Sequence, residues 1–326
     1  SIATMGTYAF THSDTWTPLA VGTYTLTTST SNPNGGTDQV TSNDSYDETV
    51  VVVDQYINRL PLFENFTSST CPPCVPANAT MLGLLGKDPA AGTNADKWAV
   101  VKYQMSWPGN GDPYYTDEGG TRRTYYGVSS VPNLWIDGGW GENGNNLTQA
   151  IIDQYAAEPA FLDITATYVV TGQTVDIDVT IDPVADIPST DLVLHMAIVE
   201  NETYQNIASN GETEFQFVMK KMVPDASGTA VGPFTNGTTV TISDSYTFNG
   251  SFVLPPDATA PIDHSVAHTV EEFTDLSVVV WVQDAVTKEV FQSAWSVESC
   301  GIASTTSVNA TCGANDGAAT RLRVRF

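Results

Sequence analysis

The hydrophobic pattern of this 326-residue chain changes period twice, and these changes constrain the fold more than any other feature. Apolar and polar residues alternate in residues 1–56 and again after Phe161, as expected of β-strands with one buried face. Between them, residues 57–160 alternate apolar strands with helical segments, which is typical of an α/β unit. The sequence therefore predicts a multidomain, β-rich chain with one α/β unit, followed by a β-sandwich at 161–298 and a short β tail at 299–326.

The N-terminal segment, residues 1–56, contains three strand-like runs, at 2–12, 22–31 and 48–55. Three strands give an apolar face little cover, and independent stability usually needs more. We therefore expect a partial β-sandwich, completed either by strands upstream of this segment or by strands of another chain.

The rest of the chain, after residue 56, divides into three segments with different element patterns. In residues 161–298, seven strand-like runs separated by turn signals predict an antiparallel sandwich of immunoglobulin type. The tail after residue 298 contains Cys300 and Cys312, which we expect to form a local disulfide. In residues 57–160, we expect strands at 59–66, 98–105 and 132–138, helices at 74–86 and 147–157, and a long loop before the last strand.

Charge and composition exclude several classes of function. Twelve Lys and Arg oppose 37 Asp and Glu, giving a formal charge of −25, which repels nucleic acids and anionic membrane surfaces. No apolar run approaches the roughly 20 residues that a transmembrane helix needs. Four cysteines, few lysines and Asn-x-Ser/Thr triplets, as at Asn65, Asn146 and Asn236, favour an extracellular or outer-surface protein exported through an oxidising compartment. We expect that any export signal has been removed or lies upstream of Ser1.

The stretch "TSSTCPPCVPANATM" places Cys71 and Cys74 between an apolar strand and a predicted helix. At this position, unpaired backbone N–H groups and the helix dipole stabilise a thiolate, so Cys71 would attack and Cys74 would resolve the mixed disulfide. Zinc binding is the competing interpretation of C-x-x-C. It is disfavoured because the four histidines show no partnering spacing near the pair.

"GVSSVPNLWIDGG" at 127–139 places Pro132 just before a strand, one βαβ length after the cysteine helix. Together with Cys71 and Cys74, this resembles the thioredoxin superfamily, in which a cis-proline loop faces the C-x-x-C motif. The resemblance implies a thioredoxin-like domain at 57–160, with Pro132 positioning a substrate peptide if the site is redox-active. Ser69 and Thr70 replace the usual aromatic residue, Pro72 removes an N–H, and no buried carboxylate near the pair can be identified from sequence.

Longer stretches, including "LFENFTSSTCPPCVPAN", "FVMKKMVPDASG" and "LSVVVWVQDAVTKEVFQSAWS", resemble the outer-membrane-protein-28 family of Bacteroidetes secreted and surface proteins. The resemblance covers residues 57–296 and implies export, with a thioredoxin-like unit followed by a β-sandwich. Residues 22–52 resemble the last strands of cell-adhesion β-domains, and residues 305–320 resemble the opening of surface repeats in gliding adhesins.

Two further features are candidate binding sites. Arg122 and Arg123, beside Tyr125 and Tyr126, could bind an anion, although pairing of this basic spot with Asp117 or Glu118 is the favoured interpretation. The sequence indicates no cofactor other than calcium, for which the oxygen-rich loops "DPYYTDEGG" and "DGGWGENGNN" are candidates, although neither has EF-hand spacing.

The final residues, "RLRVRF", alternate arginine with apolar residues, so a strand there would present three cations on one face. We expect this strand either to pair within its own tail or to complete the N-terminal sandwich of another copy by strand addition, building head-to-tail filaments. The sequence therefore favours a structural or adhesive surface protein that binds itself, other surface proteins or glycans. The alternative is an exported thiol–disulfide oxidoreductase. The assembly strand comprises Arg321, Leu322, Arg323, Val324, Arg325 and Phe326.

Overall fold

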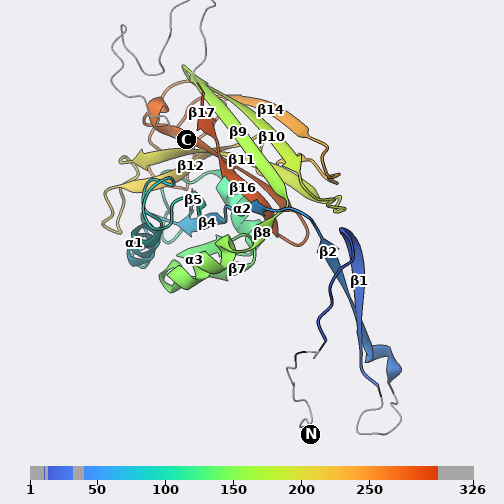
Figure 1. Ribbon diagram of the computed structural model, residues 1–326. Coiled ribbons are helices and arrows are strands. Elements are labelled where there is room, and N and C mark those ends of the chain that lie inside the picture. The colour runs from blue at the N-terminus through green and yellow to red at the C-terminus, as the bar shows by residue number, and fades with distance from the viewer. Residues whose placement is uncertain (1–10, 12–13, 32–39, 300–326) are drawn as a thin grey trace, which may run out of the picture. The chain divides into compact units, whose positions relative to one another are not determined.

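The computed structural model describes residues 11, 14–31 and 40–299 (Figure 1). The chain divides into two compact units between Tyr56 and Ile57, and each unit is described by itself.

In the first unit, strands β1 (Gly22–Ser29) and β2 (Ser45–Val52) form an antiparallel hairpin. The register pairs Gly22 with Val52 and Ser29 with Ser45, and a 3-10 turn at Thr41–Asn43 precedes β2. Within the described residues, this sheet has only these two strands. The predicted run at 2–12 lies almost entirely outside them.

The α/β segment of the second unit is built around strand β4, which pairs in parallel with β5 and antiparallel with β6. All six residues of β4 and all six of β5 are buried. Each predicted strand and helix of this segment is present, and helix α2 occupies part of the region predicted as a loop. The elements are β3 (Ile57–Asn58), β4 (Leu62–Thr67), α1 (Cys74–Leu85), β5 (Ala99–Gln104), α2 (Asp117–Tyr126), β6 (Asn133–Ile136), β7 (Trp140–Glu142), a 3-10 turn (Gly144–Asn146), α3 (Gln149–Ala156) and β8 (Pro159–Ala160).

The remaining strands form two layers around one apolar core. One layer is a four-stranded sheet in the order β14-β10-β9-β17, and the other contains β16, β15, β11 and β12. Alternate residues of β9 and β10 are buried, which matches the predicted period of two. The immunoglobulin type remains a prediction. The elements are β9 (Leu162–Thr171), β10 (Thr174–Pro183), β11 (Leu192–Thr203), β12 (Phe215–Val223), β13 (Thr229–Ala230), β14 (Val240–Thr247), a 3-10 turn (Phe273–Asp275), β15 (Leu276–Asp284), β16 (Val290–Trp295) and β17 (Val297–Glu298).

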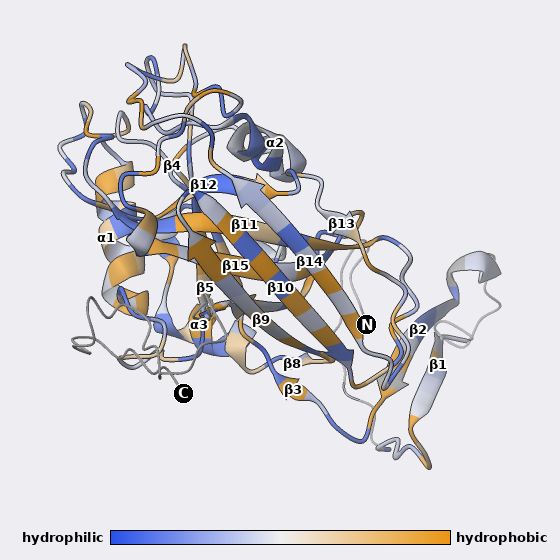
Figure 2. Cartoon of the chain, turned by 90° about the horizontal axis from the view of Figure 1, so that it is seen from above, coloured by the Kyte–Doolittle hydropathy of each residue, from blue (hydrophilic) through white to orange (hydrophobic). Residues whose placement is uncertain are grey.

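One sheet continues from the second layer into the α/β segment. Strand β12 pairs in parallel with β5, with Val218 opposite Lys102, giving the order β16-β15-β11-β12-β5-β4-β6-β7. The short strands β3 and β8 form a separate pair. Figure 2 shows β11, β12 and β15 lying behind the β14-β10-β9 layer, with α1 at the left of this view and α2 at the top. Residues 57–160 and 161–298 therefore share one sheet.

Candidate functional site

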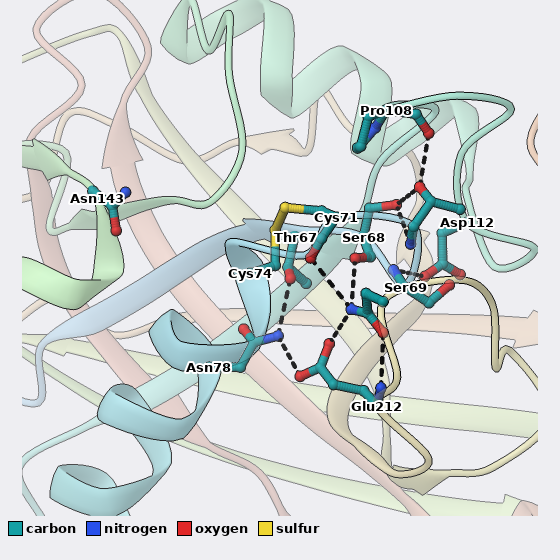
Figure 3. Close-up of a disulfide and its surroundings, with 12 residues drawn as sticks. Thr67, Ser68, Ser69, Cys71, Cys74, Asn78, Pro108, Asp112, Asn143 and Glu212 are labelled. Carbon is teal, nitrogen blue, oxygen red and sulfur yellow. Dashed lines mark hydrogen bonds between the residues drawn. A yellow bond between two sulfur atoms is a disulfide. The ribbon is translucent and has the colours of Figure 1, made fainter.

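The two cysteines lie in the turn that joins β4 to α1. The backbone N–H of Cys71 donates to the carbonyl of Ser68, and that of Cys74 donates to the carbonyl of Cys71, so the chain reverses tightly before the helix begins at Cys74. Pro73 is the N-cap, a position where its missing N–H costs no helical hydrogen bond. The cysteines form a disulfide with 5.3 Å between their Cα atoms (Figure 3).

Both cysteines are buried, with Cys71 1% and Cys74 0% exposed. The loop between β11 and β12 covers the turn. The backbone N–H of Asn210 donates to the carbonyl of Ser69 over 2.8 Å, and its side-chain amide donates to the carbonyl of Ser68 over 3.2 Å. A partner thiol reaches a disulfide only along an open path. In this conformation, the loop lies over the turn that carries the disulfide.

A polar network connects the covering loop to α1. Asn78 on α1 is buried, and its amide donates to Thr67 Oγ1 over 3.0 Å and to Glu212 Oε1 over 2.9 Å (Figure 3). Its side-chain oxygen accepts from Asn65 Nδ2 over 3.0 Å. Glu212 also accepts from Asn210 over 2.6 Å. Strand β4, helix α1 and the covering loop are thus held in one hydrogen-bonded arrangement beside the disulfide.

The structure contains a buried carboxylate near the pair, which could not be identified from the sequence. Asp112 is fully buried, and its two oxygens accept the backbone N–H groups of Ser69 and Tyr114 over 2.7 and 2.8 Å. Burial raises the pKa of Asp112, although these N–H groups and Asn206 act in the opposite direction. Sequence reasoning placed Asp112 in a calcium-loop candidate because aspartate is common in such loops. Its observed role is to fix the turn before Cys71.

Lys102 on β5 is a second group that sequence reasoning missed. It is 2% exposed and lies opposite Asn65 in the β4–β5 register, so both side chains share a face of the sheet. Burial lowers its pKa to about 8, while the Glu212 carboxylate acts to raise it. Lys102 forms no ion pair within 4.0 Å among the described residues. The site therefore contains a buried amine without a direct carboxylate partner.

Arg122 is not available for a ligand, and its predicted pairing with Asp117 or Glu118 was wrong. It is 2% exposed, and its guanidinium donates to both oxygens of Glu64 on β4, at 2.7 and 2.9 Å. Burial opposes the charged form of Arg122, but the Glu64 carboxylate, Tyr126 and Tyr103 together outweigh this effect, so the pKa of Arg122 is raised. This buried ion pair also contacts Gln283 of β15. It therefore links the α/β segment to the sandwich.

The other residues of the basic spot have separate environments. Arg123 donates through Nε to the carbonyl of Val128 over 2.8 Å, and its guanidinium lies 4.7 Å from the Trp107 ring centre. Glu118 pairs with Lys221 of β12. Burial raises the pKa of Tyr125 to about 12.

The remaining predicted features have mixed outcomes. The Val131–Pro132 peptide is cis and Pro132 is buried.

In the described ranges, no three His, Cys, Asp or Glu side chains gather as metal ligands, and Asp137 of the second calcium-loop candidate pairs with Arg59 instead. None of the helices in the described part of the chain has the length and apolar character needed to cross a bilayer. Cys300, Cys312 and the strand at 321–326 lie outside the described residues.

The fold is similar to that of HBP35 of Porphyromonas gingivalis, with a TM-score of 0.53 and 14% sequence identity over 78% of this chain and 80% of that chain. A structural-genomics target from Agrobacterium tumefaciens is also similar, with a TM-score of 0.45 and 15% identity over 78% of this chain and 100% of that chain. No family model and no curated protein matches the sequence. The likeness to HBP35 shows a shared fold.

Proposed function

We propose that the protein is a secreted or surface structural subunit that assembles with copies of itself, and that its thioredoxin-like α/β unit uses the Cys71–Cys74 disulfide as a structural crosslink. The resemblance of residues 57–296 to the outer-membrane-protein-28 family supports export. The chain also shares its fold with HBP35 of Porphyromonas gingivalis.

The observation that carries this proposal is the covered disulfide. A thiol–disulfide oxidoreductase needs an accessible sulfur that a substrate thiolate can attack in line. Here both cysteines are buried and the Asn210 loop of the sandwich is hydrogen-bonded over their turn. Such a disulfide restrains the turn between β4 and α1, and it persists where no reductant pool exists.

Assembly is proposed at the N-terminal hairpin. Trp16 and Tyr46 are 45% and 65% exposed, and an isolated hairpin of two strands is at best marginally stable. The segment 1–56 contains six acidic residues and no Lys or Arg, whereas residues 321–326 contain three arginines. Charge complementarity therefore favours addition of the 321–326 strand of a second copy to this hairpin. The six acidic residues are Asp14, Asp38, Asp44, Asp47, Glu48 and Asp54.

Light scattering and electron microscopy test the assembly. We compare the full chain, a chain lacking residues 320–326, and two triple variants in which Arg321, Arg323 and Arg325 become lysine or glutamate. Filaments or oligomers are expected for the full chain and the lysine variant, because both keep the positive charge. They should be lost in the truncated and glutamate variants. Monomers in all four samples would remove the assembly proposal.

An exported thiol–disulfide oxidoreductase is the second candidate. The position of the C-x-x-C turn at the start of α1 favours it, with Cys71 as nucleophile and Cys74 as resolving thiol. Insulin reduction, disulfide isomerisation and the reduction potential of the pair distinguish the two functions. A structural crosslink predicts no activity and a low potential, whereas turnover that is lost in Cys71→Ser would establish the enzyme.

A further inference from the structure

A cleft of about 620 Å³ lies along the outer side of α2, and neither the assembly nor the disulfide uses it. Three aromatic residues line it: Trp107, Tyr115 and Tyr125. A Cβ at Gly120 would lie 2.4 Å from the hydroxyl of Tyr115, so a larger residue at this position would displace the end of the Tyr115 side chain. Ligand clefts span about 300–1,000 Å³, so this volume suits a small molecule or one or two units of a polymer.

The cleft contains an arginine with free donors. Nine Lys and Arg lie among the described residues, and six of them form ion pairs. Arg123 is not among the six. Its Nε is fixed to the carbonyl of Val128 and its guanidinium lies over Trp107, but its two terminal nitrogens have no hydrogen-bond partner in the described chain. This guanidinium is therefore held in position with two parallel donors available, the geometry that binds a carboxylate.

The rim of the cleft consists of hydrogen-bond acceptors. The hydroxyls of Thr121 and Thr124 donate to the helix carbonyls of Asp117 and Gly120, over 3.0 and 2.9 Å, so each oxygen has lone pairs left for a ligand. The exposed carboxylate of Asp117 adds further acceptors at the first residue of the helix. A ligand that satisfies this rim must carry hydrogen-bond donors, and the hydroxyls of a sugar are such donors.

We propose that this cleft binds a sugar acid, that is, a pyranose ring that bears a carboxylate, either free or as a unit of an acidic polysaccharide. The Arg123 guanidinium takes the carboxylate, the aromatic rings contact the apolar face of the sugar, and the acceptors on α2 take its hydroxyls. A simple anion would gain only the first of these contacts, against the field of a chain whose formal charge is −25. The cleft is independent of the strand addition proposed above.

Calorimetry and tryptophan fluorescence with the full chain test the site. The probes are glucuronate, glucose, cyclohexanecarboxylate and oligogalacturonate. Glucuronate is expected to bind at least about tenfold more tightly than glucose, which lacks the carboxylate, and than cyclohexanecarboxylate, which lacks the hydroxyls. Tighter binding of oligogalacturonate than of glucuronate would identify a polymer as the source, and the reverse order would identify a free sugar acid. Equal affinity for glucuronate and glucose, or binding of neither, would overturn the proposal.

Variants assign the binding to the cleft. Arg123→Gln should weaken glucuronate binding by about tenfold or more, whereas Lys97→Gln, which removes an exposed cation that does not line the cleft, should leave it unchanged. Thr121→Glu leaves Arg123 and its contacts in place. It adds a negative charge to the rim of the cleft, which repels the carboxylate of the ligand, so it should also weaken glucuronate binding. Circular dichroism verifies that each variant is folded. Wild-type affinity in a folded Arg123→Gln or Thr121→Glu variant would refute the assignment.

Discussion

Replacing Lys102 with methionine should stabilise the protein at neutral pH. The amine is 2% exposed, and burial lowers its pKa from 10.5 to about 8. Each pKa unit corresponds to about 1.4 kcal/mol, so holding the charged form in the fold costs roughly 3 kcal/mol. Methionine has a similar length and carries no charge, so it removes this cost with little repacking.

The pH dependence gives the sharper test. Between pH 8 and 10.5, the unfolded chain still binds the Lys102 proton while the folded chain does not, so the wild type gains stability as pH rises through this window. Below pH 8 both states are protonated and the full penalty is present. The stability gap between Lys102→Met and wild type should therefore be about 3 kcal/mol at pH 7 and shrink towards zero near pH 10.5.

Urea unfolding at several pH values, under conditions that keep the disulfide oxidised, measures the gap. Lys97→Met is the matched control, because Lys97 is an exposed lysine paired with Asp153. It should change stability by no more than about 0.5 kcal/mol, and evenly across the pH range. A Lys102→Met protein that is less stable than wild type at pH 7, or a gap that does not vary between pH 7 and 10.5, would refute the reasoning.

Three further predictions concern other parts of the second unit. Glu64→Gln leaves a buried arginine uncompensated and should lower the free energy of unfolding by about 3 kcal/mol or more, measured by urea titration; a loss below about 1 kcal/mol would contradict a buried pair. Asn210→Ala removes side-chain contacts that hold the covering loop, so dithiothreitol should reduce the disulfide several-fold faster; an unchanged rate would show that the loop does not limit access. Gly138→Ala should destabilise by about 2 kcal/mol or more, because its φ is +71° and a Cβ would collide with the carbonyl of Lys288, whereas Gly83→Ala inside α1 meets open space and should stabilise by about 0.5–1 kcal/mol. Thermal unfolding of the two glycine variants verifies this opposite sign.

The elements of the sandwich were predictable where one face of a strand meets solvent. Strands β9 and β10 alternate buried and exposed residues, and that alternation is visible in the sequence. All nine residues of β12 are buried, so its sequence carries no signal of which strand lies beside it. The parallel pairing of Val218 with Lys102 joins segments that are 116 positions apart, and no local pattern encodes such a contact. The sheet that joins the two segments therefore became visible only in the structure.

Helix α2 was missed for a local reason. Its sequence, "DEGGTRRTYY", carries two interior glycines and few apolar residues, which lowers its helix propensity. The caps were nevertheless available as signals: Thr116 accepts the N–H of Gly119 at the start, and Gly127 adopts the left-handed conformation at the end. Gly120 has a packing role that only the position of Tyr115 reveals.

The site was predictable in its covalent part and not in its surroundings. The C-x-x-C spacing indicated where the cysteines meet a helix, and the structure joins them in a disulfide. The groups that surround them come from distant positions. Asp112 lies between β5 and α2, and Asn210 and Glu212 lie in the loop between β11 and β12. Their proximity to the cysteines therefore depends on the tertiary fold.

The shared sheet has a consequence for biogenesis. During synthesis, residues 57–160 leave the ribosome first, and strand β5 then has β4 on one side and no partner on the other until β12 emerges. An open edge of this kind is a template for pairing with strands of other chains, so the nascent chain is exposed to mispairing until β12 has been synthesised. For the same reason, the α/β segment cannot be transferred to another protein as an independent domain. Without β12, one edge of β5 would be unpaired, and we expect such a protein to aggregate.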